Sequence, residues 1–350
     1  MAYELAEARE LVLRACKELV DHKLITRTWG NISARVSNNQ FVITPSGRDY
    51  DTLTPEDIVI VDLKGRYEGD IAPSSEKGVH AAVYSLRPDV DFVIHTHQTY
   101  ASALSVLGYS INLGKRVSVE TKYLVGPNII CAEYGRNASK KLCDAVGAAI
   151  EENPRCNHVL MKNHGALCFG RDYSEAFKVT YTLEALSKKV YEYYTKESIL
   201  KEPQSIDVVQ SIPKSLLGDK GESSELIGEW ILHVRTPYVC AISANGSTMK
   251  AYLDDLAQIA GTSIKCAPID ADKKKVESLR GSNSAVFMEG DGAYCYGDTL
   301  DEAKAVAIVL EKACIATYLA ELKGADPLKF VDALHDRTTY IKKYSKLKNQ

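Results

Sequence analysis

The sequence has no long hydrophobic run, no pair of closely spaced cysteines and no excess of charge of one sign. No apolar segment approaches the roughly 20 residues that a membrane-spanning helix needs, and residues 1–7 lack the basic start and apolar stretch of a signal peptide. The 43 basic and 46 acidic side chains give a net charge of −3, which implies no basic face for nucleic acid. We therefore expect neither a membrane nor a nucleic acid as a partner.

The nine cysteines are scattered singly along the chain, and none belongs to a Cys-x-x-Cys pair. A thiolate zinc site or a redox-active dithiol therefore has no support in the sequence. Several cysteines, such as Cys168, lie in apolar runs, where cysteine behaves as a small hydrophobic residue. Because unpaired thiols fit a reducing compartment best, we expect a cytoplasmic protein.

What the chain does contain is the composition of a globular protein with more than one domain. Its 350 residues are 45% hydrophobic and 25% charged, and this length suggests two domains. Helical and strand patterns alternate along the chain, which predicts a mixed α/β fold. Helices are expected at 5–20, 76–87 and 174–195, and strands at 41–43, 58–61, 92–94 and 159–161.

A polar stretch at residues 201–222, with Pro203, Pro213, Gly218 and Gly221, predicts a linker between two domains. Such a linker would separate a first domain, residues 1–200, from a second and smaller domain, residues 223–350.

The second domain is in part a copy of the first. Residues 159–191 align without a gap on residues 286–318, and twelve of the 33 positions are identical, where about two would be expected by chance. The strand–turn–strand–helix unit has therefore been duplicated. The copies differ in chemistry at one position, where His164 of the first copy is Asp291 in the second.

Three histidines of the first domain are candidate metal ligands. His95 and His97 are separated by one residue at a predicted strand end, so their rings project to the same face. His164 follows another strand end, where it can meet the first two. Each motif alone is more often structural, but the second copy lacks both the His-x-His pair and the third histidine. Three histidines with an open fourth position are typical of a catalytic zinc site.

Three turns rich in hydroxyl or amide groups precede the His-x-His motif: Gly30-Asn31, Thr44-Pro45-Ser46-Gly47 and Pro73-Ser74-Ser75-Glu76. Each alone could be a plain turn or a helix N-cap, but together they are typical of a divided phosphate cradle. Glu76 is a candidate proton-transfer group, with a first-turn glutamate that stabilises the helix dipole as the alternative. His80, one turn later, is a spare ligand candidate, for which packing is the simpler role.

Together these motifs resemble the class II aldolase/adducin family, whose members include fuculose-1-phosphate aldolase. The similarity runs from about Ala8 to Thr195, and the second domain shares it only through the duplication. The resemblance rests on five motifs in the family's order: Thr28-Trp29-Gly30-Asn31, Thr44-Pro45-Ser46-Gly47, Pro73-Ser74-Ser75-Glu76, His95-Thr96-His97 and Asn163-His164-Gly165.

The resemblance implies a three-layer α/β/α sandwich around a mixed, largely antiparallel sheet, followed by a degenerate, smaller α/β domain without metal ligands. It implies a divalent metal, most often Zn2+, on His95, His97 and His164, with Glu76 as the acid/base group. The metal would polarise a carbonyl as a Lewis acid. The implied phosphate-binding and substrate-binding residues are Gly30, Asn31, Ser46, Gly47, Ser74 and Ser75.

The reaction that the resemblance favours is cleavage of a small phosphorylated ketose to dihydroxyacetone phosphate and an aldehyde, because the epimerase branch typically carries Asp where this chain has Glu76. An epimerase, decarboxylase or dehydratase on the same site stays open, as does a noncatalytic adducin-like interaction protein. Aldolases of the family also use a tyrosine some twenty residues after the His-x-His motif, where this chain has Lys115-Arg116. Glu120, Tyr123 or one of Tyr191 to Tyr194 could replace it.

The resemblance also implies a homo-oligomer, because family members commonly form four-fold tetramers with sites between subunits. A fused copy could instead give a dimer with pseudo-four-fold symmetry. In the second domain, Asp254 and Asp255 lie in a predicted helix, where we expect them on the solvent-exposed side rather than in an effector or interface site.

Overall fold

The computed structural model describes residues 2–22, 24–25, 29–115, 117–196, 205–213 and 228–344. Contacts between residues divide the chain into two compact units, Met1–Glu192 and Tyr193–Lys346, which we call unit 1 and unit 2. The predicted domain limits stay predictions, and most of the predicted linker 201–222 lies outside the described residues.

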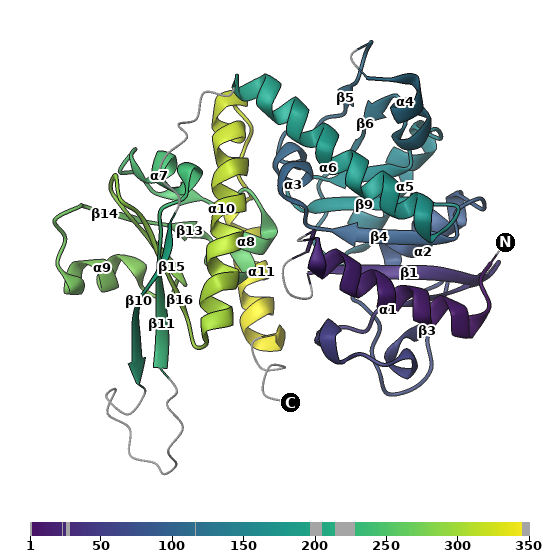
Figure 1. Ribbon diagram of the computed structural model, residues 1–350, viewed down its shortest axis with the longest axis horizontal. Helices are drawn as coiled ribbons and strands as arrows, with labels where there is room; N and C mark the ends of the chain where they lie inside the picture. Colours follow the sequence, from purple (N-terminus) through teal and green to yellow (C-terminus); the bar gives the residue numbers. More distant parts are fainter. Residues whose placement is uncertain are drawn as a thin grey trace. The chain divides into compact units, whose positions relative to one another are not determined.

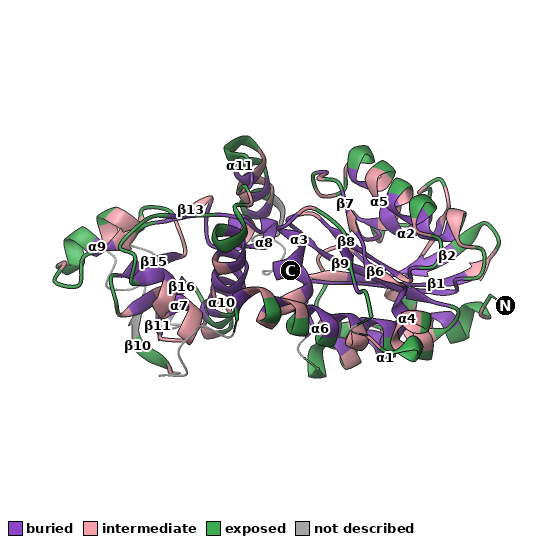
Figure 2. Cartoon of the chain, turned by 90° about the horizontal axis from the view of Figure 1, so that it is seen from above, coloured by how far each residue is buried: buried purple, intermediate pink, exposed green. Residues whose placement is uncertain are grey.

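Unit 1 is a three-layer α/β/α sandwich around a seven-stranded sheet of order β3-β2-β1-β4-β9-β8-β7 (Figures 1 and 2). All neighbouring strands are antiparallel except β7 and β8, so the predicted sheet is confirmed. The helices are α1 Leu5–Asp21, α2 Lys77–Leu86, α3 Thr99–Ser105, α4 Val119–Val125, α5 Lys140–Glu152 and α6 Tyr173–Thr195. The strands are β1 Gly30–Ser37, β2 Gln40–Ile43, β3 Val59–Asp62, β4 Phe92–Thr96, β5 Ile111–Asn112, β6 Asn128–Ile129, β7 Cys131–Ala132, β8 His158–Met161 and β9 Gly165–Gly170.

Alternating strand residues divide the core of unit 1 into two hydrophobic clusters, one on each face of the sheet. On β4, Val93 packs in the cluster that contains residues of α2 and α5, whereas Phe92 and Ile94 pack in the cluster that contains residues of α1 and α6. Figure 2 shows the buried strands between the two helical layers. Because His95 follows Val93 by two residues, its side chain lies on the α2 face of the sheet.

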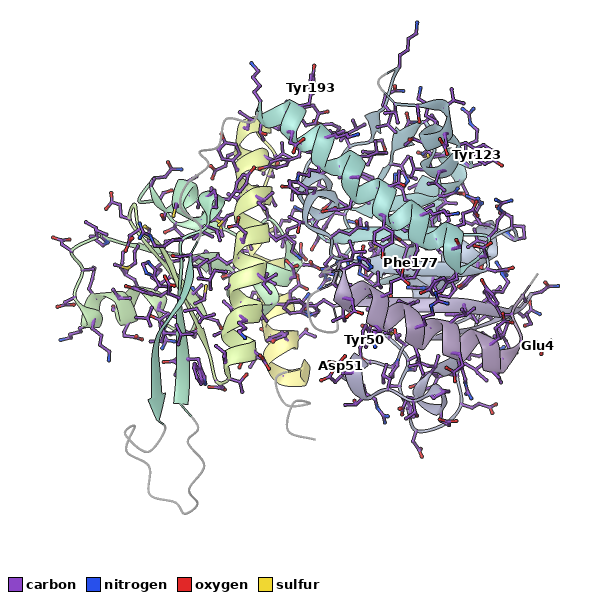
Figure 3. The ribbon with its side chains drawn as sticks, viewed as in Figure 1. Glu4, Tyr50, Asp51, Tyr123, Phe177 and Tyr193 are labelled. Carbon is purple, nitrogen blue, oxygen red and sulfur yellow. The ribbon has the colours of Figure 1, made fainter. Side chains whose placement is uncertain are left out.

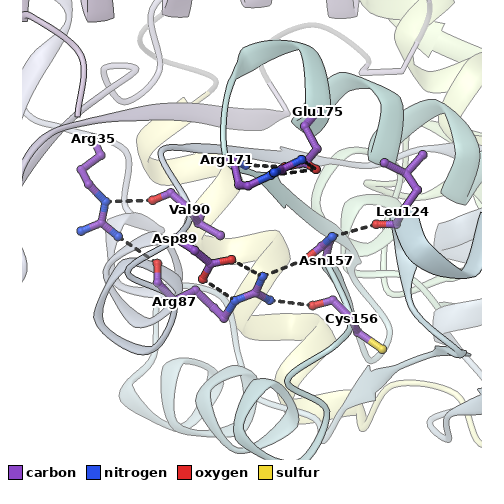
Figure 4. A network of polar contacts seen from close by, with 9 residues as sticks. All are labelled: Arg35, Arg87, Asp89, Val90, Leu124, Cys156, Asn157, Arg171 and Glu175. Carbon is purple, nitrogen blue, oxygen red and sulfur yellow. Dashed lines mark hydrogen bonds and ion pairs between the residues drawn. The ribbon is translucent and has the colours of Figure 1, made fainter. Parts of the chain in front are cut away.

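The connection between α2 and β4 is fixed by two arginines (Figure 4). Arg87, the C-cap of α2, donates to both carboxylate oxygens of Asp89 and to the side-chain oxygen of Asn157, just before β8. Arg35 of β1 donates to the carbonyl oxygens of Arg87 and Val90. Charge-assisted bonds to backbone carbonyls are strong when buried, so the start of β4 is tied to β1 and β8.

Unit 2 contains a five-stranded sheet of order β10-β11-β16-β15-β14, antiparallel except for β14 and β15. The strands are β10 Ile206–Pro213, β11 Gly228–Val234, β12 Met249–Lys250, β13 Ser263–Ile264, β14 Cys266–Ala267, β15 Ala285–Met288 and β16 Gly292–Gly297. The helices are α7 Pro237–Ser243, α8 Asp254–Ile259, α9 Lys273–Arg280, α10 Leu300–Lys323 and α11 Phe330–Thr339.

Unit 2 differs from the sequence-based expectations in two details. Residues 206–213, within the predicted linker, form β10 and pair with β11. The expected solvent exposure of Asp254 and Asp255 is wrong, because they are 4% and 0% exposed, and Asp255 forms an ion pair with Lys312 of α10. A buried lysine supplies the counter-charge that makes a buried carboxylate tolerable, and helical periodicity gives no sign of so distant a partner.

No helix within the described part of the chain combines the length and the apolar character that a membrane span requires.

His158, at the start of β8, makes the stability of the fold depend on pH. It is fully buried, Nδ1 donates to the carbonyl oxygen of Val125 (3.0 Å), and Nε2 accepts from the N–H of Ile130 (3.3 Å). Burial lowers the pKa of His158 to about 4. In the unfolded chain His158 is protonated below about pH 6.5, whereas in the folded chain it stays neutral down to about pH 4. The folded state therefore loses stability as the pH falls from 6.5 towards 4.

We expect this histidine to contribute about 3 kcal/mol of acid destabilisation between pH 7 and pH 4, since each pKa unit corresponds to about 1.4 kcal/mol. His158→Gln keeps a donor and an acceptor but cannot ionise, so its free energy of unfolding should fall less between pH 7 and pH 4 than that of the parent. Urea unfolding at pH 7 and pH 4 measures the free energy of unfolding of both proteins. An equal loss of unfolding free energy between the two pH values in parent and variant would contradict the assignment.

Candidate active site

The His-x-His motif lies where β4 ends, and its two rings come together. His95 belongs to β4 and His97 follows the strand, and the two residues are 0% and 7% exposed. Their ring centroids are 4.9 Å apart, and their Nε2 atoms are 3.1 Å apart. On the neighbouring strand β1, Asn31 lies directly opposite His95.

His164 reaches the same point from the turn between β8 and β9. Its Nε2 lies 2.9 Å from Nε2 of His95. The turn requires Asn163 at φ 62°, a left-handed conformation that Asn adopts more readily than most residues. Gly165 follows, where a Cβ would collide with the carbonyl oxygen of Thr96 on β4. The close approach of the two strands at this glycine is what brings the third ring to the first two.

Glu76, the N-cap of α2, adds a carboxylate to the three rings. Its Oε2 lies 3.2 Å from Nε2 of His95, and its Oε1 lies 3.2 Å from Nε2 of His164. Burial raises the pKa of Glu76, but the adjacent His95 and His164 rings outweigh burial and hold that pKa well below its ordinary value. The side chain is therefore an ionised carboxylate at the edge of the histidine cluster.

This donor set fits a divalent cation. The candidate ligand atoms of His95, His97 and His164 all lie within 4.8 Å of one another, and a tetrahedral zinc ion would space its ligand nitrogens by about 3.3 Å. Nδ1 of His95 donates to the carbonyl oxygen of Ala166 (3.0 Å), which leaves its Nε2 lone pair facing the cluster. Oε1 of Glu76 is buried without a hydrogen-bond donor. Electron-rich atoms that converge in this way repel one another unless a cation lies between them.

Two of the predicted phosphate-binding turns lie side by side next to Glu76. The N–H of Ser46 donates to the carbonyl oxygen of Ala72 (2.9 Å), and the N–H of Ser74 donates to the carbonyl oxygen of Thr44 (3.0 Å). Ser74 Oγ in turn accepts from the N–H of Glu76 (3.2 Å). Ser46 and Gly47 are half-buried, Ser74 is buried and Ser75 is exposed. Backbone hydrogen bonds therefore join these two predicted turns next to the start of α2.

The third predicted turn, Gly30-Asn31, is instead the start of β1, and it is held by a tyrosine that the sequence analysis missed. Gly30 has φ 131°, and a Cβ there would lie 2.7 Å from the carbonyl oxygen of His95, so only glycine fits. The hydroxyl of Tyr50 donates to the carbonyl oxygen of Gly30 (2.7 Å), and burial raises the pKa of Tyr50. A tyrosine in a polar turn gives no sequence signal of this contact. Thr28, at the start of the same motif, lies outside the described residues.

The other predicted candidates lie on α4 and near the end of α6. Glu120 and Tyr123 are exposed on α4, and Tyr123 is 78% exposed (Figure 3). Tyr191 is buried, with its ring centroid 5.3 Å from that of Tyr100, and Tyr193 is exposed.

Unit 2 keeps the framework of this site with different chemistry. Tyr294 is the counterpart of Leu167 in the gapless alignment. Strand pairing places His233 opposite Tyr294 and His95 opposite Leu167, so His233 occupies the position of His95. The next two counterparts are Arg235 for His97 and Asp291 for His164. Nε of Arg235 lies 3.2 Å from Oδ1 of Asp291, and Nε2 of His233 donates to the backbone carbonyl of the same aspartate (2.7 Å).

The sequence analysis missed His233 because the offset between the copies changes. The offset is 127 between His164 and Asp291 but 138 between His95 and His233, so the gapless alignment does not reach back to His233. In unit 1, residues 38–91 connect β1 to β4 and contain Glu76 and two of the predicted phosphate turns. In unit 2, only residues 214–227 lie between the corresponding strands β10 and β11. Across the described ranges, the three histidines of unit 1 are the one group of side chains that could hold a metal ion.

Comparison with known families agrees with this division. The family described as Class II Aldolase and Adducin N-terminal domain matches residues 10–191 and again residues 229–318. The chain therefore belongs to the class II aldolase and adducin family, and unit 2 contains a second copy of the family's domain. The predicted family and the predicted duplication are both confirmed.

Several relatives match about half of this chain or somewhat more. The 5-deoxy-D-ribulose 1-phosphate aldolase of Bacillus thuringiensis serovar kurstaki is 33% identical over 221 residues, which are 61% of this chain and 97% of that protein. The L-fuculose phosphate aldolase of Methanococcus maripaludis is 33% identical over 180 residues, 51% of this chain and 93% of that protein. A solved L-fuculose 1-phosphate aldolase is 30% identical, with a TM-score of 0.49 over 55% of this chain and 88% of that one.

We expect the purified chain to bind about one equivalent of zinc or a similar divalent ion, since only unit 1 gathers three imidazoles. His95→Gln should abolish tight binding and the rise in Tm that a bound metal produces. The matched control is His233→Gln, the same substitution at the same strand position of unit 2, which should leave metal content unchanged. Metal analysis after dialysis decides, and a second equivalent that His233→Gln removes would contradict this assignment.

Proposed function

We propose that this protein is a divalent-metal-dependent aldolase that cleaves a small phosphorylated ketose to dihydroxyacetone phosphate and an aldehyde. The proposal rests on one observation, the convergence of three histidine nitrogens and an ionised Glu76 beside the paired turns that contain Ser46 and Ser74. The aldolase names of relatives that are 33% identical support it over an epimerase, a decarboxylase, a dehydratase or a noncatalytic role.

His95, His97 and His164 would hold the metal, with zinc as the favoured ion. When bound, the metal would act as a Lewis acid on the carbonyl of the ketose. The N–H groups of Gly47 and Ser75 and the hydroxyls of Ser46, Ser74 and Ser75 would bind the phosphate, helped by the start of α2. This placement would set the sugar carbons next to Glu76.

Glu76 would carry the protons of the reaction. As an ionised carboxylate it would accept the proton of the hydroxyl on the carbon that becomes the aldehyde, while the bond between that carbon and its neighbour breaks. It would then return a proton to the carbon that becomes part of dihydroxyacetone phosphate, so that no net proton is gained or lost. Glu76 is assigned both transfers because its carboxylate oxygens lie 3.2 Å from the Nε2 atoms of His95 and His164.

Two further proposals accompany this function. All nine cysteines are free thiols, and we keep the expectation of a cytoplasmic location. We also keep a homo-oligomer, either a tetramer or a dimer with pseudo-four-fold symmetry, which sedimentation or light scattering of the full chain tests directly.

The metal-loaded full chain should release dihydroxyacetone phosphate from at least one ketose 1-phosphate in a panel that includes 5-deoxyribulose 1-phosphate and fuculose 1-phosphate. Glu76→Gln should lower kcat by about 100-fold or more, the usual contribution of a positioned acid–base group. Coupled reduction of dihydroxyacetone phosphate measures the rate.

Glu175→Gln is the control, because that carboxylate pairs with Arg171 at the start of α6 and takes no part in the cluster. If the metallated chain epimerises, decarboxylates or dehydrates these sugars without cleaving them, the aldolase proposal fails. If it binds metal but transforms none of them, the noncatalytic alternative is favoured.

A further inference from the structure

A row of buried polar side chains runs from Glu76 along the interface between β1 and α2, away from the histidines. Asn31 and Ser33 stand two residues apart on β1, and Glu76, His80 and Tyr84 stand four residues apart along α2. Two residues of a strand advance about 6.6 Å, and four residues of a helix advance about 6 Å. The two rows therefore stay in register, and their side chains alternate along one line.

Every neighbouring pair in this line is in hydrogen-bond contact. Nδ2 of Asn31 donates to Oε2 of Glu76 (3.0 Å), and Oδ1 of Asn31 lies 2.5 Å from Nε2 of His80. Nδ1 of His80 lies 2.6 Å from Oγ of Ser33, which lies 2.8 Å from the hydroxyl of Tyr84. Asn31, Ser33, His80 and Tyr84 are each at most 4% exposed, so water does not compete for these bonds.

The contacts of Asn31 fix the direction of every proton in the line. Asn31 presents its NH2 group to Oε2 of Glu76 and its oxygen to Nε2 of His80. His80 must then donate from Nε2, and its unprotonated Nδ1 accepts from the hydroxyl of Ser33. The hydroxyl of Tyr84 donates to Ser33 in turn. Burial lowers the pKa of His80 to about 3, which agrees with a neutral ring that has one donor and one acceptor.

We propose that His80 is a positioning residue that locks the amide of Asn31 with its NH2 group towards Glu76 and the substrate. This inference rests on the proposed function of the same site. An amide turned by 180° would set its carbonyl oxygen against the Glu76 carboxylate, and also against a phosphate or hydroxyl oxygen of the substrate. Nδ2 carries two hydrogens, so one N–H holds Glu76 while the other is available to the substrate. The ring of His80 therefore decides that Asn31 offers an N–H to the substrate, although His80 itself is bonded to neither Glu76 nor the substrate.

The activity test compares His80→Leu, which removes both bonds at similar volume, with His80→Gln, which keeps a donor and an acceptor. In the metal-loaded full chain, His80→Leu should lower kcat about 10- to 100-fold, as the loss of an outer-shell partner usually does, and His80→Gln should recover most of it. His158→Leu and His158→Gln are the matched controls, because His158 is equally buried but bonded only to backbone groups. Their kcat should stay within about two-fold of the parent.

A double-mutant cycle separates positioning from packing. If His80 acts through Asn31, the kcat of Asn31→Ala/His80→Leu should equal that of Asn31→Ala alone within about two-fold, because the ring has nothing left to orient. Multiplicative losses would overturn the proposal. Should His80→Leu fail to fold, Ser33→Ala replaces it, and there the lost donor to Nδ1 should cost a smaller, roughly 3- to 10-fold share of kcat.

A readout that needs no turnover keeps this proposal distinct from the proposed function. In nitrogen-15 spectra of the full chain, the His80 ring should be the Nε2–H tautomer and should not titrate between pH 5 and pH 8. The Asn31 amide protons should be protected from exchange in the parent and in His80→Gln, but not in His80→Leu. An Nδ1–H tautomer, or equal protection in all three proteins, overturns the proposal. An inactive parent with the expected tautomer and protection would refute the aldolase reaction alone.

Discussion

Mutual repulsion among electron-rich atoms is the constraint on which the centre of unit 1 depends. Three imidazole nitrogens and a carboxylate point at one small volume, where neutral rings and an ionised carboxylate repel one another unless a proton or a metal ion lies between them. The backbone holds them together, because Gly165 lets β9 approach β4 and Gly30 lets β1 approach it from the other side. Paired strands therefore hold these side chains at short distances, which is the preorganisation that the proposed Lewis-acid site would require.

Helix α2 contacts two different parts of unit 1. Its N-terminal end, with Ser74 and Glu76, faces the histidines and the paired turns, whereas its inner face supplies His80 and Tyr84 to the polar row on β1. Arg35 continues that row by donating to the carbonyl oxygens of Tyr84 and Arg87. The helix is therefore fixed along its whole length by buried polar contacts, which tolerate displacement far less than apolar packing does.

Local sequence patterns predicted most of this architecture, because strand alternation and helical spacing are local properties. They placed the His-x-His motif at the end of β4 and Glu76 at the start of α2, as the structure has them. What they missed depends on partners distant in the chain. The burial of Asp255 depends on Lys312, the contact of Tyr50 depends on the shape of one turn, and the equivalence of His233 with His95 depends on strand register. No periodicity within one segment contains that information.

The second copy keeps the strand geometry of unit 1 without the three histidines. Asn163 and Gly290 adopt the same left-handed conformation at equivalent turns, and Gly292 makes the same close strand approach as Gly165. At the ends of these strands, a guanidinium from Arg235 now meets the carboxylate of Asp291. The positive charge that the proposed metal ion would bring to unit 1 is supplied in unit 2 by the side chain of Arg235. The proposed metal would therefore act in unit 1 alone, because the Arg235–Asp291 ion pair of unit 2 forms without it.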